Sequence, residues 1–267
     1  EIANALNKGV SEGNVYPVYA CAGYTGDGVD MLLDEIAFSA PLASEHAGEG
    51  DVECDENGPL AAVCFKTVAD PFVGKMSYIR VMSGKLSANT DAVNTAVGGS
   101  EKIGKLYTLL GKKQTEVTCA AAGDIVVASK ISAGTSATLC SSARTVRFGE
   151  IEFPKPCYSM AVKAKAQGDE AKISSAMQRI LEEDPTLTYI QDENTKEQIL
   201  SGLGEQHLEV TASKLKGKFG VEIKLEVPKI AYREKIRKKV KVEGKHKKQS
   251  GGHGQYGNVW IEFEPCV

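Results

Sequence analysis

The sequence has no apolar run that is long enough to cross a membrane as a helix. Such a helix needs roughly 20 consecutive apolar residues, and every uninterrupted apolar stretch in this 267-residue chain is far shorter. Residues 1–10 mix charged and apolar side chains at helical spacing, which is unlike a secretory signal. We therefore expect a cytoplasmic protein with no membrane partner.

Closely spaced metal ligands are also absent. The seven cysteines are scattered without any Cys-x-x-Cys pair, and the four histidines form no His-x-x-x-His arrangement. Structural zinc sites need such local pairs of ligands, whereas an odd number of scattered cysteines is typical of reduced thiols in the cytosol. We therefore predict reduced thiols and no metal site.

Positive charge is concentrated near the end of the chain, although the formal net charge is −3. Residues 229–248 contain basic side chains against only Glu234 and Glu243. The basic residues are Lys229, Arg233, Lys235, Arg237, Lys238, Lys239, Lys241, Lys245, Lys247 and Lys248. Such a cluster is typical of a surface that faces nucleic acid, but it also occurs on a solvated strand face, and composition alone leaves both readings open.

The hydrophobic pattern predicts a multidomain protein of α and β elements. Residues 1–44 are expected to form a small α/β segment, with helices over 3–10 and 29–37 and a short buried strand over 15–20. Residues 45–59 are acidic and contain glycine. That composition predicts a linker or an exposed loop.

Residues 60–150 contain short strand-like segments at turn-punctuated intervals, with no strong helix between them. Closely spaced strands of this kind predict a small antiparallel β-barrel, because closure removes exposed strand edges. The expected strands are 60–69, 75–82, 91–97, 101–110, 116–119 and 124–130.

Two further segments complete the chain. Residues 151–227 follow the order β-α-β-β-α-β, which is typical of a ferredoxin-like α+β domain. Residues 228–267 predict a β-hairpin, and an isolated hairpin is only marginally stable, so we expect its partner strands to be missing. The facing residues are Val240 and Val242 on one strand and Val259, Ile261 and Phe263 on the other.

A glycine-rich loop lies between these two strands and directly follows a group of lysines. Glycines let a main chain approach a ligand closely, and lysines neutralise phosphate. A plain hairpin turn is the alternative, since glycines between strands commonly serve geometry. We predict that this end of the hairpin contacts RNA through Lys245, Lys247, Lys248, Ser250, Gly251, Gly252, His253, Gly254 and Gln255.

Six stretches of the sequence have the character of family motifs. They are FKTVADPFVGK at 65–75, IRVMSG at 79–84, EEDPT at 182–186, SGLGEQHLE at 201–209, YRE at 232–234 and QSGGHGQYG at 249–257. In sequence, order and spacing they resemble elongation factor G and its close paralogues among the translational GTPases. The resemblance covers essentially the whole chain.

The resemblance implies a fragment of a longer protein. Residues 1–44 would be the end of a GTP-binding domain, 60–150 a second domain, 151–227 a third, and 228–267 the truncated start of a fourth. In the family the GTP-binding domain hydrolyses GTP with Mg²⁺. The other domains contact ribosomal RNA and proteins, and the fourth reaches tRNA and mRNA.

One nucleotide motif of the family falls inside this chain. It is usually Ser-Ala-Leu or Ser-Ala-Lys, and here it corresponds to Ala22, Gly23 and Tyr24. The resemblance implies that these three residues are a remnant of the guanine-binding segment. Their departure from the usual residues favours a divergent paralogue.

The chain itself lacks the sequence needed to hydrolyse GTP. That reaction needs a Gly-x-x-x-x-Gly-Lys-Ser/Thr loop that cradles phosphate, and no such loop is present. We therefore predict no catalytic residue and no cofactor in this chain, whereas the intact parent protein would use GTP and Mg²⁺. His207 is expected to be partly buried near a helix start, without a catalytic role.

The resemblance implies a ribosome-binding fragment of a GTPase that promotes translocation of tRNA and mRNA in protein synthesis. Two alternatives stay open. One is a stand-alone RNA-binding module without catalysis, and the other is a fragment of a ribosome-recycling or ribosome-protection GTPase.

Overall fold

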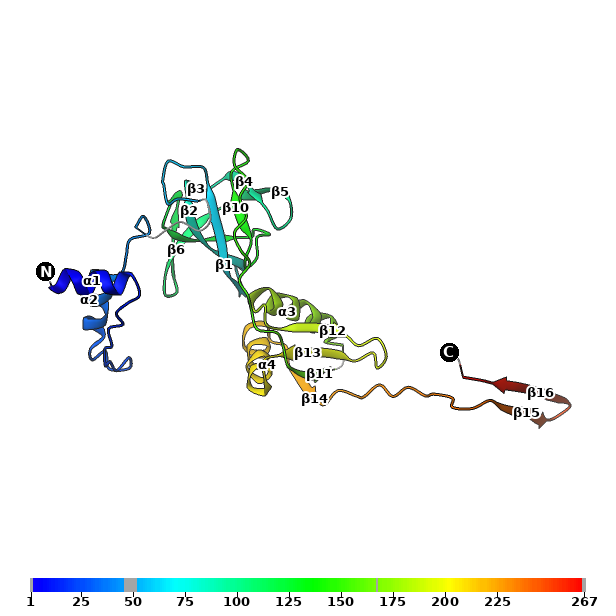
Figure 1. Cartoon of the computed structure of the whole chain (residues 1–267). Helices are drawn as coiled ribbons and strands as arrows, with labels where there is room; N and C mark the ends of the chain where they lie inside the picture. Colours follow the sequence, from blue (N-terminus) through cyan, green and yellow to red (C-terminus); the bar gives the residue numbers. More distant parts are fainter. Residues whose placement is uncertain (1, 46–51, 167, 266–267) are drawn as a thin grey trace.

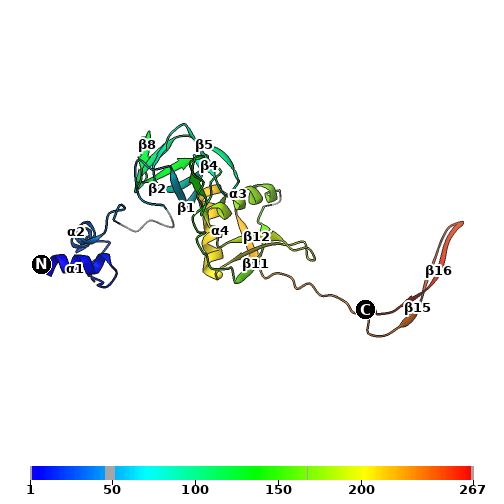
Figure 2. The ribbon, with the colours of Figure 1, turned by 45° about the horizontal axis from the view of Figure 1, so that its top comes forward.

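The computed structural model describes residues 2–45, 52–166 and 168–265. They form a helix pair, a β-barrel, an α+β domain and a β-hairpin, in chain order (Figure 1). Figure 2 shows the same succession after rotation. This confirms the predicted multidomain fold class, while the limits placed at 44, 59, 150 and 227 stay a prediction. The middle of the predicted linker, 46–51, and the last two residues of the chain lie outside the described residues.

The helix pair consists of α1 (Ile2–Ser11) and α2 (Val29–Ser39), which confirms both predicted helices. The predicted strand over 15–20 is wrong, because this segment has no strand pairing and Val18 is 93 % exposed. A strand needs a neighbour for its backbone N–H and C=O groups, and no described strand pairs with this segment. Among the described residues, no helix is long and apolar enough to span a bilayer.

The barrel is built from antiparallel strands, as predicted. Its larger sheet has the order β5-β4-β10-β1-β2-β9-β6-β7, and β3 pairs with β8. Fully buried side chains such as Ile79, Leu106 and Leu139 fill the interior. The strands are β1 (Ala61–Asp70), β2 (Gly74–Ser83), β3 (Lys85–Ser87), β4 (Thr90–Asn94), β5 (Gly99–Ile103), β6 (Leu106–Leu110), β7 (Lys113–Val117), β8 (Cys119–Ala121), β9 (Ile125–Ser129) and β10 (Thr138–Cys140).

The expected single strand over 101–110 is wrong, since the structure divides it into β5 and β6. Ile103 and Leu106 are both fully buried in the same core. Side chains alternate along a strand, so residues three apart point to opposite faces. A break at Gly104 therefore allows both side chains to enter the barrel core.

The α+β domain has the predicted ferredoxin-like arrangement. Its strands form one antiparallel sheet in the order β12-β13-β11-β14. Buried residues from both helices, including Met177 and Leu208, pack in one core with Leu200 of the sheet. The elements are β11 (Tyr158–Ala164), α3 (Glu170–Glu183), β12 (Thr188–Gln191), β13 (Gln198–Gly202), α4 (Glu205–Phe219) and β14 (Ile223–Glu226).

The hairpin consists of β15 (Val240–Ser250) and β16 (His253–Phe263), paired along their whole length. The register places Val240 opposite Phe263 and Val242 opposite Ile261, which confirms the predicted facing of the apolar residues. Residues 227–239 join the hairpin to β14 without strand or helix. An ion pair from Lys229 to Glu197 ties the start of this connection to the α+β domain.

Candidate nucleic-acid interface

The two faces of the hairpin differ in chemistry because side chains alternate along each strand. Residues directly opposite each other in the register share a face, so Lys247 lies beside Tyr256 and Glu243 beside Trp260. We call this side the lysine–aromatic face. Its members are Lys241, Glu243, Lys245, Lys247, Tyr256, Asn258, Trp260 and Glu262.

The opposite side carries aliphatic and aromatic side chains at its base. This apolar face consists of Val240, Val242, Val259, Ile261 and Phe263, which are all between 40 % and 52 % exposed. A sheet with one buried and one wet side shows this kind of alternation. The apolar face is therefore the side suited to packing, and the lysine–aromatic face is the side suited to solvent or a polar partner.

The predicted RNA-contact residues all lie at one end of the hairpin, but they are divided between its faces. Lys245 and Lys247 belong to the lysine–aromatic face, whereas Lys248 lies opposite Gln255 on the other side. Gly251 and Gly252 make the turn, and Gly251 has φ 58°, a left-handed conformation that suits glycine. The remaining members lie beside the turn, with Ser250 opposite His253 and Gln249 opposite Gly254.

The lysines at this end are free of ion-pair partners within the described part of the chain. No ion pair there involves Lys245, Lys247 or Lys248. In contrast, Lys239 at the base of the hairpin pairs with both Glu262 and Glu264. Among the described residues, the three lysines near the turn therefore have no carboxylate partner, whereas Lys239 at the base has two.

Two lysines of this face lie close to its aromatic rings. Nζ of Lys241 is 5.7 Å from the centroid of the Trp260 ring, and Nζ of Lys245 is 6.0 Å from that of Tyr256. Both distances fall within the range of cation–π attraction. Trp260 is 59 % exposed and Tyr256 is 66 % exposed, so the rings remain accessible. Reasoning from the sequence missed these two rings, although their spacing of four residues on one strand was a usable signal.

The predicted nucleotide remnant lies in an exposed turn that follows α1. The backbone N–H of Ala22 donates to Asp27 O at 2.9 Å, and the side chain of Tyr24 is fully exposed. No lysine or arginine occurs between residues 15 and 28. The turn is remote from the hairpin (Figure 1), so the structure does not bring the two predicted sites together.

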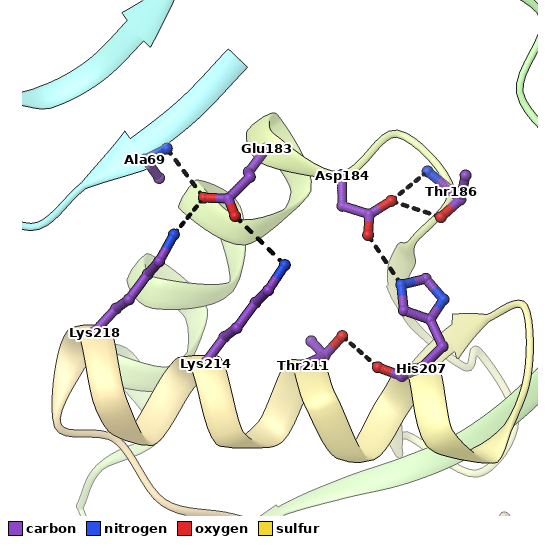
Figure 3. Close-up of polar contacts among 8 residues, drawn as sticks. All are labelled: Ala69, Glu183, Asp184, Thr186, His207, Thr211, Lys214 and Lys218. Carbon is purple, nitrogen blue, oxygen red and sulfur yellow. Dashed lines mark hydrogen bonds and ion pairs between the residues drawn. The ribbon is translucent and has the colours of Figure 1, made fainter. Parts of the chain in front are cut away.

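A third polar cluster joins the barrel to the α+β domain at the end of α3 (Figure 3). The carboxylate of Glu183 accepts a hydrogen bond from the backbone N–H of Ala69 at 3.1 Å. It also accepts from Nζ of Lys218 at 2.7 Å and of Lys214 at 3.4 Å. On one edge, β1 pairs with β10 only over 61–63. The backbone N–H of Ala69 therefore has no strand partner on that edge, and the carboxylate of Glu183 is its acceptor.

The electrostatics of Glu183 follow from these contacts. Burial alone would raise the pKa of this carboxyl, but the bonds from Lys218 and Ala69 and the charge of Lys214 outweigh it and lower the pKa. The ionised form is therefore the one that holds the two domains together.

Asp184 faces the other way and holds the start of α4. Its carboxylate lies 2.9 Å from Nε2 of His207, and it accepts from both the backbone N–H and the hydroxyl of Thr186. Burial would raise the pKa of Asp184, but the bonds from Thr186 and His207 lower it. Because Nδ1 of His207 accepts from the N–H of Leu203 at 3.1 Å, Nε2 is the nitrogen that donates. The expectation that His207 is partly buried at a helix start is confirmed.

No described residues form a metal centre. Within the described ranges there is no group of three His, Cys, Asp or Glu side chains arranged to hold an ion. The candidate site is the hairpin, where accessible rings and lysines without ion-pair partners occur together among the described residues.

Three family models match successive parts of the chain. Residues 59–141 match "Elongation factor G domain 2", 153–227 match "Elongation Factor G, domain III", and 228–266 match "Elongation factor G, domain IV". The matches follow one another in the order of the barrel, the α+β domain and the hairpin segment.

Individual proteins show the same relationship. The chain is 40 % identical to the elongation factor G of Fervidobacterium nodosum and 39 % identical to an elongation factor G-like protein of Thermotoga maritima, in each case over 99 % of the chain and 40 % of the relative. A crystal structure from Thermus thermophilus superposes with a TM-score of 0.76 at 35 % identity, over 99 % of this chain and 39 % of that one. The chain thus spans about two fifths of the length of these relatives. Three domain models in the family's order, together with this level of identity over almost every residue, establish that the chain belongs to the elongation factor G family.

Proposed function

We propose that this chain is the ribosome-docking part of an elongation factor G-type GTPase, and that the glycine end of its hairpin contacts ribosomal RNA. The observation that carries the proposal is the uncompensated charge of Lys245, Lys247 and Lys248 beside the turn at Gly251 and Gly252. Lysines that are not neutralised by the protein are available to phosphate. Membership of a family of translation elongation factors supports ribosomal RNA as the source of that phosphate.

The activity of the whole protein is part of the same proposal. We take it to be GTP hydrolysis with Mg²⁺, coupled to the movement of tRNA and mRNA on the ribosome in the cytoplasm. The residues of this chain that would lie nearest to guanine are Ala22, Gly23 and Tyr24. Their exposed turn offers no basic side chain for phosphate and no acidic cluster for Mg²⁺, so it does not fit a nucleotide site by itself.

Salt-dependent binding to ribosomes tests the docking surface. Replacing Lys245, Lys247 and Lys248 together by Gln should weaken binding at least about tenfold and lower the slope of log affinity against log salt by about 3, close to one unit per lost phosphate contact. The matched control removes the same charge from three exposed barrel lysines, Lys102, Lys112 and Lys113. A hairpin variant that kept the affinity and the salt slope of the unaltered chain would overturn the assignment of the contact to the hairpin end.

Calorimetric titration with GTP and Mg²⁺ tests the assignment of the nucleotide site to another part of the parent protein. We expect no heat of binding from this chain, because it has no phosphate-binding loop. Micromolar affinity would contradict this assignment and would leave the docking surface unaffected.

A further inference from the structure

The lysine–aromatic face combines two features that bind different parts of a nucleotide. Tyr256 and Trp260 are four residues apart on β16, so their rings lie on the same side, with their Cα atoms roughly 13 Å apart at the usual rise of a strand. Every nucleobase has a flat π-face, and aromatic side chains that are accessible to solvent are the usual platforms for unpaired bases. At this spacing each ring accommodates a different base.

Each ring has an ammonium group beside it. Lys245 lies next to Tyr256, Lys241 lies next to Trp260, and Lys247 is directly opposite Tyr256 in the register. A base stacked on one of these rings would bring its own phosphate within reach of the neighbouring lysine. The long, flexible lysine side chain gives up a weak cation–π contact and gains a phosphate contact.

The acidic residues of this face argue against a simple polyanion groove. Glu243 is directly opposite Trp260, and Glu262 is opposite Lys241. The side-chain amide of Asn258 donates to the carboxylate of Glu243 at 3.0 Å, which orders this carboxylate on the lysine–aromatic face. The Trp260 end is therefore close to neutral, and its main feature is the accessible indole. A continuous phosphate track would need positive charge along the whole face, whereas a stacking platform does not.

We propose that the lysine–aromatic face binds unpaired RNA by stacking one base on Tyr256 and another on Trp260, with Lys245 and Lys247 holding the phosphates. This inference rests on the proposed function in one respect, namely that RNA is the partner. It differs in placing specificity for single strands on one face of the hairpin and away from the glycine turn. Duplex RNA has its bases stacked internally and cannot cover the two rings in this way.

The chain contains a single tryptophan, and it is Trp260. Its fluorescence therefore reports directly on this face. Titration with a short oligoadenylate should quench the emission, because a stacked base contacts the indole. The same oligomer annealed to its complement should quench far less at equal phosphate concentration. Inorganic polyphosphate, which has charge but no bases, should bind through the lysines without quenching.

Two pairs of variants separate stacking from charge. Tyr256→Leu should weaken oligoadenylate binding roughly tenfold, which lies within the range for loss of one base–aromatic stack. Tyr232→Leu removes a tyrosine outside the hairpin that is even more exposed, at 87 % against 66 % for Tyr256, and should bind as the unaltered chain does. Lys247→Gln should weaken binding several-fold more than Lys248→Gln, because these neighbours carry the same charge on opposite faces. The lysine pair keeps the test valid if Tyr256→Leu disturbs the strands.

The outcomes distinguish this inference from the function on which it rests. Equal quenching by single-stranded and duplex RNA, or equal affinities of the Lys247→Gln and Lys248→Gln variants, would overturn the stacking face. Salt-dependent ribosome binding would still stand in that case. If the chain instead failed to bind ribosomes while single-stranded RNA quenched Trp260, the docking proposal would fail and the stacking face would remain.

Discussion

The contact between the barrel and the α+β domain offers the most direct test of how this structure is held together. Its central group is Glu183, whose side chain is only 14 % exposed. Replacement by Gln keeps the shape but removes the charge that Lys218 and Lys214 approach, and it weakens the acceptor for the N–H of Ala69. Hydrogen bonds to charged groups contribute about 1.5–3 kcal/mol each in favourable cases. Because the lysines are partly exposed, we expect a total loss of about 2 kcal/mol.

Urea unfolding of the whole chain provides the measurement. Glu183→Gln should lower the free energy of unfolding, and the matched control is Glu182→Gln, which removes the same charge from the neighbouring position. Similar free energies for the two variants would refute the reasoning, because they would show that the contacts of Glu183 contribute nothing beyond net charge.

The pH dependence of the same variant gives a second reading. The folded-state pKa of Glu183 is lowered, since the bonds from Lys218 and Ala69 outweigh burial. A group with a lowered pKa contributes stability that is present above its ordinary pKa and is lost as pH falls through the folded value. The difference in free energy of unfolding between the unaltered chain and Glu183→Gln should therefore be largest near neutral pH and shrink under acid conditions. A difference that grew on acidification would contradict the assigned sign.

Two further predictions concern the barrel and the sheet of the α+β domain. Gly84→Ala should destabilise the barrel by about 3 kcal/mol or more, because φ is 70° and a new Cβ would lie 2.7 Å from Gly58 O, which adds overpacking to left-handed strain. The control is Gly98→Ala, where φ is 68° but the space is open, so this variant should lose only about 1 kcal/mol of unfolding free energy in thermal or urea unfolding. Equal losses in the two variants would contradict the steric argument. Hydrogen bonds from Lys216 and Lys165 lower the pKa of Glu222 to about 2. This pKa should rise in Lys216→Gln, and NMR shifts of the carboxyl carbon would follow the titration. An unchanged titration would show that the ion pair between Lys216 and Glu222 does not form in solution.

The parts of the fold that depend on local pattern could be predicted from the sequence. The β-α-β-β-α-β order of residues 151–227 was sufficient for the α+β domain, and Ile173, Met177 and Ile180 form the buried face of its first helix. The alternation of Val240 and Val242 likewise set the facing of the hairpin. In these cases the signal lies within one or two neighbouring elements.

Other features depend on partners far away in the chain, so no local pattern encodes them. The apolar run at 15–20 has the composition of a strand, but no described strand pairs with it. The three-residue strand β10 is fully buried, yet it is too short to show a period. Glu183 has no special feature in the sequence, because its partner Ala69 lies 114 residues earlier in the chain.

The candidate site was predicted only in part. The lysine cluster and the glycine turn identify the end of the hairpin, but a list of residues does not divide them between faces. Lys247 and Lys248 are neighbours in sequence and occupy opposite sides in the structure. The two-residue period of each strand, together with a two-residue turn at Gly251 and Gly252 that sets the register, would have grouped Tyr256 and Trp260 with Lys245 and Lys247 from the sequence alone.

The adjacent carboxylates at the end of α3 have a mechanical consequence. Glu183 forms ion pairs with two lysines in the second half of α4, and Asp184 is bonded to His207 in the first turn of the same helix (Figure 3). Both halves of α4 are thereby bonded to residues 183 and 184, and Glu183 is also bonded to Ala69 near the end of the barrel strand β1. A partner that tilts α4 therefore either breaks the bond at Ala69 or, where that bond holds, displaces the barrel together with the helix.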